Sequence, residues 1–439
     1  MPLKVDSASD FVKFFMDYFN LGNTSLHENF FAPLKQIYPQ SSKQYDCTSI
    51  SDLDFAKLGT LRCISHTTTG HEFIQHHGLE TNDFYEVSHF FKALKSKRRL
   101  ANLISINSLL NEHSKPLLPD AFAPVPELAN FDIYAGDGHY QKASCFDKTI
   151  EGKKRATGHF FRLDLRSHHL DYISLEKRDL GKKKKHDATI IKEADPEALR
   201  NHAPKGRQVI YCWDKACIDY LQWSKLKHNN GIYFITQEKS NSAAEQMSNN
   251  LHDAADPRNE GVVTDCFVGT AGRMMRRIIY IDPRDGKRYT YITNELTLPA
   301  FALVLIYKIR WDEEKVFYQL KSKFHERKSW ASSDTAKQAQ AYFQCLAHNL
   351  ALLIEEIIKQ HENLEDEIEI KKKEGRSKHL KNREGEPLTA NKNYINQIIE
   401  RASHRTQRFI RWLRHQLYRQ VPWSESMRLL KISWLKNPT

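Results

Sequence analysis

The sequence has few cysteines and no long apolar run, and each absence argues against a class of protein. Seven cysteines are scattered over 439 residues, and none forms a Cys-x-x-Cys pair. A structural zinc site usually needs such closely spaced pairs, so the pattern argues against one and favours a reduced, intracellular protein. No stretch approaches the roughly 18 apolar residues that a transmembrane helix needs, and the first residues lack the apolar core of a signal peptide.

What the sequence does have is an excess of positive charge. Its 66 Lys and Arg outnumber 54 Asp and Glu, which gives a net charge of +12 and a pI near 9.1. From residue 371 onward, 17 Lys and Arg stand against 5 Asp and Glu. This balance favours a polyanionic partner such as nucleic acid, although a basic but solvated surface is an alternative.

Length and local patterning divide the chain into parts. A chain of 439 residues exceeds what one core usually serves, so we expect two or three domains. A dense cluster of prolines in residues 115–130 interrupts the helical pattern. Proline disfavours helix both at its own position and at the residue before it. The predicted parts are a helical domain at 1–114, a proline-rich linker at 115–130, an α/β domain at 131–360 with a β insertion at about 240–296, and a basic helical tail at 361–439.

Two predicted amphipathic helices carry basic residues. In the first, over residues 82–110, the basic residues include Lys97, Arg98 and Arg99. In the second, over residues 393–420, apolar positions alternate with Arg401, Arg405 and Arg408. A basic helix face can be merely solvated or can bind DNA phosphates, and the second helix could also mediate dimerisation.

Two aspartates stand at the ends of predicted strands. Asp137 closes the run IYAGD, and Asp214 closes VIYCWD. Side chains at the end of a central strand face the crevice where α/β sheets bind ligands. Asp132 is an alternative to Asp137, but it lies near the start of its strand, so we favour Asp137. We expect Asp219 and Asp312 to be surface residues.

A third carboxylate belongs to a long helix predicted over about 298–324, with Thr297 as N-cap. At 100° per residue, four of its residues fall within an arc of about 60°. They are Tyr307, Arg310, Glu314 and Lys321. Glu313 lies off this stripe, so Glu314 is the candidate. The alternative is a solvated row stabilised by an Arg310–Glu314 pair.

Three converging carboxylates need cations, because like charges cannot otherwise all stay ionised at short range. Ligands that are all oxygen select Mg²⁺ or Mn²⁺, and two such ions can hold the attacking and leaving oxygens of a phosphoryl transfer. Arg310 and Lys321 would then hold nucleic-acid phosphates beside the metals. We expect His139 and the His168–His169 pair to be hydrogen-bonded in strands or turns rather than to be ligands.

The spacing Tyr307-x2-Arg310-x3-Glu314-x6-Lys321 resembles the Tyr-Arg-Glu-Lys motif of the insertion-sequence-four family of cut-and-paste DNA transposases. TNEL (293–296), Trp311 and the contexts GDG and WDK are similar to that family too, over about residues 130–355. The resemblance implies a ribonuclease-H-like catalytic domain with a β insertion. It also implies a DDE triad of Asp137, Asp214 and Glu314, and contacts of the other three motif residues with the transposon-end backbone.

The resemblance leads to a functional expectation. We expect a transposase that recognises terminal inverted repeats, cleaves at the element ends, and joins the 3′-hydroxyls to target DNA. Its active form would be a dimer or larger assembly, in a prokaryotic cytoplasm and associated with the nucleoid. Two alternatives stay open: a nuclease of the same fold that never joins ends, and a catalytically silent DNA-binding regulator derived from a transposase.

One departure from the family concerns the β insertion. Members that form a DNA hairpin can stack a flipped base on a Trp in this insertion, but residues 240–296 contain no Trp. Tyr289, Tyr291 or Phe267 could substitute, because any aromatic face can stack a base. The sequence therefore predicts the cleavage chemistry but leaves the hairpin step open.

Overall fold

The structure is a computed structural model, and it describes most of the chain. Six side chains named in the sequence analysis lie outside the described residues: those of Asp312, Glu313, Lys321, Arg401, Arg405 and Arg408. The described residues are 24–38, 50–65, 69–149, 152–175, 194–242, 244–249, 251–311, 314–316, 318, 328–362, 393–402, 407–417 and 422–435.

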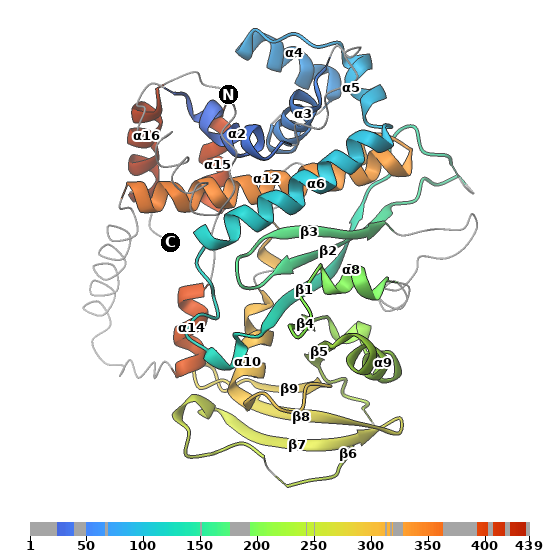
Figure 1. Cartoon of the computed structure of the whole chain (residues 1–439), viewed down its shortest axis with the longest axis vertical. Helices are drawn as coiled ribbons and strands as arrows, with labels where there is room; N and C mark the ends of the chain where they lie inside the picture. The colour runs from blue at the N-terminus through green and yellow to red at the C-terminus, as the bar shows by residue number, and fades with distance from the viewer. Residues whose placement is uncertain are drawn as a thin grey trace.

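One nine-stranded sheet runs through the lower two thirds of the molecule (Figure 1). Its strand order is β3-β2-β1-β4-β5-β9-β8-β7-β6. β1 is parallel to β4, and β4 is parallel to β5, whereas the other neighbours are antiparallel. The strands are β1 (Phe131–Gln141), β2 (Thr157–Asp164), β3 (Leu170–Leu175), β4 (Gln208–Cys212), β5 (Ile232–Gln237), β6 (Glu245–Gln246), β7 (Val262–Thr270), β8 (Arg273–Ile281) and β9 (Arg288–Thr293).

Several local structures follow from capping and turn residues. Asp195 caps α8 (Pro196–Arg200), and its side chain accepts a hydrogen bond from the Glu197 backbone. α9 (Tyr220–Asn230) ends at Gly231, whose φ of 62° lies in the left-handed region that favours glycine. The turn between β8 and β9 is closed by a bond from the Gly286 N–H to the Asp282 carbonyl.

The β insertion extends the central sheet. β9 pairs antiparallel with β5, and β8 and β7 follow it outward. The polar segment TNEL anchors this junction. The Thr293 hydroxyl donates to the Phe234 carbonyl (2.6 Å), and Asn294 bonds the backbones of both Phe234 and Trp223. TNEL therefore ties β9 to β5 and α9 immediately before the next helix begins.

The start of that helix corrects one prediction. α10 spans Ala300–Ile309, and Thr297 is not its N-cap, because the Thr297 hydroxyl and N–H both donate to the buried Glu295 carboxylate. Pro299 occupies the cap position instead. The single helix predicted over 298–324 was also wrong, because α10 ends at Arg310, although residues 314–316 are again helical.

Helices cover both faces of the sheet (Figure 1). α8 and α9 pack on one face with Tyr211, Trp213 and Phe234, in one hydrophobic cluster. α10 and α12 (Asp334–His361) pack on the other face, in a larger cluster. α10 is apolar nearly all round and is buried at nine of its ten positions, as expected for a helix inside a core.

The N-terminal helices pack against α12 and share its core. The helix predicted over 82–110 is in fact two, because the chain turns at Leu94 and Lys95 and Ser96 then caps a new helix. Gly59 gives close packing: a Cβ there would lie 2.3 Å from the Phe343 ring. The helices are α2 (Leu26–Ile37), α3 (Asp52–Ile64), α4 (Gly70–Thr81), α5 (Val87–Ala93) and α6 (Lys97–Ser114).

The segments predicted as linker and tail also contribute to this core. In residues 115–130, Phe122, Val125 and Leu128 are buried. The C-terminal helices are α14 (Tyr394–Ala402), α15 (Gln407–Gln416) and α16 (Trp423–Leu435). Arg414 of α15 donates to the Ile64 carbonyl of α3 at 2.7 Å. Among the described helices, none is long and apolar enough to cross a membrane.

Candidate active site

The first two candidate carboxylates belong to neighbouring parallel strands, whose register ends with Ala135 paired to Cys212. Asp137 and Asp214 each lie two residues beyond this last pair, and Asp214 follows the end of β4. The prediction that Asp137 closes its strand was wrong, because β1 runs on to Gln141 and pairs Asp137 with Phe161 of β2. Because side chains alternate along a strand, both aspartates share the face of Ala135 and Cys212, which is the face that α10 covers.

Each aspartate is oriented by the backbone that follows it. An Oδ1 of Asp137 accepts from the Gly138 N–H at 2.7 Å, and an Oδ1 of Asp214 accepts from the Lys215 N–H at 2.6 Å. Asp214 also caps the short 3-10 turn Lys215–Cys217, which holds it at the sheet edge in solvent. Asp137 is half-buried. Each carboxylate is therefore held by the backbone N–H that follows it, although Asp214 is the more exposed of the two.

Asp132, the alternative to Asp137, is engaged elsewhere. It is 7% exposed, at the opposite end of β1, and its Oδ1 lies 2.7 Å from the Arg207 Nε. The Lys115 ammonium is 4.0 Å from the same oxygen. These contacts make Asp132 part of an internal ion-pair network rather than of the crevice at the other end of the strand.

Glu314 follows α10 on the face of the two aspartates. α10 packs directly on β4, where the Cys212 thiol donates to the Ile306 carbonyl at 3.8 Å. The Glu314 side chain is 44% exposed, and its Oε1 lies 3.2 Å from an Nη2 of Arg310. The Arg310–Glu314 ion pair, which was the alternative explanation for the stripe, is thus present. A metal-binding role for Glu314 stays a prediction.

Tyr307 supports Arg310 from inside the protein. Its ring is 7% exposed and packs against Tyr291 with centroids 4.9 Å apart. The Arg310 guanidinium lies 5.2 Å from the centre of the Tyr307 ring. Burial raises the pKa of the Tyr307 phenol, so this side chain stays neutral. Most of the Tyr307 side-chain surface packs against the protein, so little of it can contact a DNA backbone.

The candidate ligand atoms suit a hard divalent cation, although the three carboxylates are not close enough together to surround one. Carboxylate oxygens from Asp137, Asp214 and Glu314 are the ligands that Mg²⁺ and Mn²⁺ prefer. Within the described residues, no three His, Cys, Asp or Glu side chains stand close enough together to hold a metal ion. Asp137 belongs to β1 and Asp214 follows its parallel neighbour β4, whereas Glu314 is bonded to Arg310.

The basic residues predicted to bind DNA differ in exposure. Lys97 is exposed at the start of α6. Arg98 pairs with both oxygens of Asp52, and Arg99 is 4% exposed and bonds Asp52 and the Ile50 carbonyl. Arg99 is therefore a structural residue that joins α6 to α3, which corrects its assignment to a DNA-binding face. Arg401 and Arg408 belong to α14 and α15.

The histidines singled out in the sequence lie inside the protein. His139 and His159 face each other across β1 and β2 and are 3% and 2% exposed. His169 is bonded at both ring nitrogens, to Ser114 at 2.7 Å and Ser167 at 2.9 Å. For His169, the prediction of a hydrogen-bonded turn histidine is confirmed.

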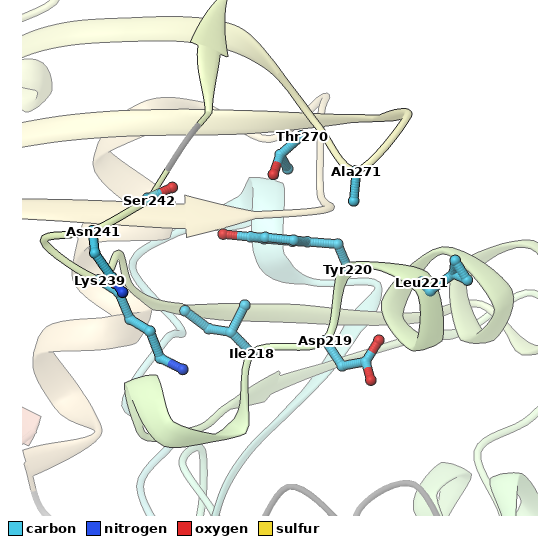
Figure 2. Close-up of a pocket in the computed structure, with 9 residues that line it drawn as sticks. All are labelled: Ile218, Asp219, Tyr220, Leu221, Lys239, Asn241, Ser242, Thr270 and Ala271. Atoms are coloured by element: carbon cyan, nitrogen blue, oxygen red, sulfur yellow. The ribbon is translucent and has the colours of Figure 1, made fainter.

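A cavity of about 450 Å³ is lined by residues 218–221, which follow β4, by residues 239–242, which follow β5, and by the turn between β7 and β8 (Figure 2). Tyr220 is the aromatic ring in its lining, with its hydroxyl directed toward Ser242. Sequence reasoning missed Tyr220, because nothing in its local pattern separates it from a core residue. Tyr291, one of the three predicted stacking rings, is fully buried. An aromatic face with amide and hydroxyl neighbours can accept a base-sized group.

Two exposed aromatic side chains flank Glu314. Trp311 is 59% exposed and Tyr318 is 54% exposed. Trp311 and Tyr318 are seven residues apart, which in a helix places them on the same side. This spacing is the signal by which the sequence could have identified the pair. These rings give the surface around Glu314 a capacity for stacking on bases.

Comparison with known proteins gives two findings. Residues 111–350 match the family described as "Transposase DDE domain". A curated protein of Sinorhizobium fredii (strain NBRC 101917 / NGR234), named "Putative transposase y4zB", is 25% identical over 166 residues. That similarity covers 35% of this chain and 46% of the relative, so the chain spans less than half the length of that protein.

Proposed function

Since the chain belongs to the family of the transposase DDE domain, which matches more than half of its length, we propose that it is a cut-and-paste DNA transposase of the insertion-sequence-four type. In this proposal it binds terminal inverted repeats, cleaves at the ends of an element, and joins the 3′-hydroxyls to target DNA. The observation that carries the proposal is that Asp137 and Asp214 each lie two residues beyond the last paired residues of the parallel strands β1 and β4, on which the helix that precedes Glu314 packs.

The strand order supports the finer fold assignment. Three antiparallel strands followed by two parallel ones, β3-β2-β1-β4-β5, form the arrangement we propose as ribonuclease-H-like. In such a sheet, ligands bind at the carboxyl ends of the parallel strands. The β insertion then adds β6 to β9 to the edge beyond β5.

The proposed mechanism assigns roles to this chain's own residues. Asp137, Asp214 and Glu314 would hold Mg²⁺ or Mn²⁺, which when bound supply charge stabilisation and an activated oxygen nucleophile for phosphoryl transfer. Arg310 holds the scissile phosphate once Glu314 turns from it toward the aspartates, and Lys321 adds a second positive charge. The protein's contribution is to align the phosphate between the carboxylates and these cations.

Glu314 is proposed to exchange its partner on DNA binding. Its present bond to Arg310 is at the surface, where an ion pair contributes only about 0–1 kcal/mol. A phosphate competes well for a guanidinium, because two parallel bonds can form. DNA would thus take Arg310 and release Glu314 to join a cation that the two aspartates already bind, which couples completion of the site to its substrate.

The proposed assembly is a dimer or larger complex that holds two DNA ends. Joining two ends to one target needs two 3′-hydroxyls, and each chain carries one candidate triad. A regulator without catalysis and a nuclease without joining remain the alternatives. Incubation with Mg²⁺ and a plasmid carrying the element's own ends separates the three: joined products support a transposase, cut plasmid alone a nuclease, and untouched plasmid a regulator.

We predict that DNA binding depends steeply on salt through the exposed lysines at the α5–α6 junction. Lys92, Lys95 and Lys97 are exposed there. Each phosphate that a lysine neutralises adds about −0.9 to the slope of log K against log salt. Changing all three to Gln should therefore reduce the slope by about 1 to 3, measured by fluorescence anisotropy at several salt concentrations.

The matched control for this prediction is Lys225→Gln, an exposed lysine on α9. It should leave the slope unchanged within error. Deleting residues 371–439 is a poor test, because α14 to α16 contribute buried side chains to the main core. A triple variant with the wild-type slope would mean that the α5–α6 junction does not contact DNA.

A further inference from the structure

A glycine and a tryptophan pack together directly behind Asp137 and Asp214. Gly136 precedes Asp137, and Trp213 precedes Asp214. Because side chains alternate along strands, Trp213 lies on the sheet face opposite the carboxylates. A Cβ added at Gly136 would lie 2.5 Å from the Trp213 Cη2 and 2.6 Å from its Cζ3. Only a residue without a side chain lets the indole lie this close to β1.

The indole is held firmly from the other sides. Trp213 is 2% exposed and stacks on Tyr211 with centroids 5.3 Å apart and planes 19° apart. Its backbone N–H donates to the Ile235 carbonyl of β5 at 3.3 Å. Trp213 is thus attached to β4 and β5, and its ring reaches over the backbone of β1.

This contact lies where the β1–β4 hydrogen-bond ladder has ended. The last paired residues are Ala135 and Cys212, and the aspartates come two residues later. Among the residues that the structure describes, β1 and β4 share no ladder pair past this point. The Trp213 ring packed against Gly136 is a contact between the two chains there, so it can set their spacing and with it the separation of the Asp137 and Asp214 carboxylates.

We infer that Trp213, seated on Gly136, is a positioning residue for metal binding by Asp137 and Asp214. The inference rests on the proposed function, in which those aspartates bind divalent cations. Metal sites need their ligands placed within about 0.5 Å, and loss of a supporting contact typically lowers metal affinity by about 10-fold to 100-fold. Gly136 and Trp213 then act as a pair: a larger residue at 136 pushes the strands apart, and a smaller one at 213 lets them relax.

The test measures Mn²⁺ binding to the full-length protein, with Mn²⁺ alone as the probe and the free ion counted by electron paramagnetic resonance. Gly136→Ala and Trp213→Phe should each weaken binding by about 10-fold or more. The double variant restores the summed volume, so its affinity should return to within about threefold of wild type. Melting temperatures are measured in parallel.

Trp223→Phe is the matched control. Trp223 is 1% exposed in the same hydrophobic cluster but lies on α9, stacked on Phe234. It should lower the melting temperature and leave Mn²⁺ affinity unchanged. If Trp223→Phe weakens Mn²⁺ binding as much as Trp213→Phe does, the effect is general destabilisation and the inference is overturned.

Asp214→Asn separates failure of the inference from failure of the proposed function. Wild-type binding that is lost in Asp214→Asn supports the carboxylate assignment. If that holds but Gly136→Ala and Trp213→Phe both bind Mn²⁺ like wild type, the positioning role alone is wrong. If wild type does not bind Mn²⁺, or Asp214→Asn binds it equally well, the assignment of the metal ligands is wrong.

Discussion

Replacing Asp137 or Asp214 by Asn, or Glu314 by Gln, should abolish DNA cleavage while leaving DNA binding largely intact. Each change keeps the side-chain shape and removes the charge that would hold a divalent cation. Loss of one ligand should slow cleavage by about 10³-fold or more, which corresponds to about 4 kcal/mol of transition-state stabilisation. The measurement is single-turnover cleavage of an end-bearing DNA, with binding followed separately.

Two controls keep this result interpretable. Glu313→Gln changes the neighbouring carboxylate, which lies off the helical stripe, and should retain activity. Asp132→Asn changes the other aspartate of β1, which is ion-paired with Arg207, and should lower stability more than the intrinsic rate. An active Glu314→Gln enzyme together with an inactive Glu313→Gln enzyme would refute the choice of the third carboxylate.

Acid should destabilise the protein strongly between pH 6.5 and about pH 4, through histidines at the junction of β2, β3 and α12. Burial lowers the pKa of His169 to about 3 and that of His348 to about 4. Both are neutral in the folded state, where His348 donates from Nε2 to the His168 carbonyl at 2.9 Å. The unfolded chain binds protons at these residues below pH 6.5, so their contribution to stability is complete above that pH and is lost as the pH falls.

The expected size follows from the difference between folded and unfolded pKa. At pH 5, each of these two histidines should lower the free energy of unfolding by about 2 kcal/mol relative to pH 7. Urea unfolding at the two pH values measures this loss. His348→Gln keeps a donor for the His168 carbonyl and removes the titrating group, so its loss between pH 7 and pH 5 should be about 2 kcal/mol smaller.

The matched control is His228→Gln on the surface of α9, which should show the wild-type loss. Equal pH dependence of wild type and His348→Gln would mean that His348 titrates normally in the folded protein. A His348→Gln protein that is merely less stable at both pH values would show that its role is packing alone.

Local signals in the sequence were sufficient for much of the sheet and its helices. The Asp195 cap, the Gly231 stop and the turn at residues 283–286 rest on local signals, because capping and turn geometry depend on a few adjacent residues. The order of strands and helices also supported an α/β fold. The position of Asp214 at the carboxyl end of β4 followed from the same local patterns, and so did membership of a transposase family.

Other features were decided only by tertiary contacts. The long helix predicted over 298–324 is broken after Ile309, and Thr297 bonds the buried Glu295 instead of capping it. Arg99 looked like a DNA-binding residue, but it is buried against Asp52. A helical wheel gives the face of a residue but not which neighbour covers it, because burial depends on elements distant in the chain.

The geometry around the two aspartates shows the same division. The sequence by itself placed Asp214 at the carboxyl end of a strand, because apolar runs and turn residues are local, but it did not show that β1 continues past Asp137 to Gln141. Only the tertiary structure decided that β1 and β4 are neighbours in register up to Ala135 and Cys212, and that Trp213 packs on Gly136. The physical reason is that strand pairing and the close approach of a ring to a glycine join residues more than 70 positions apart, so no local pattern carries them.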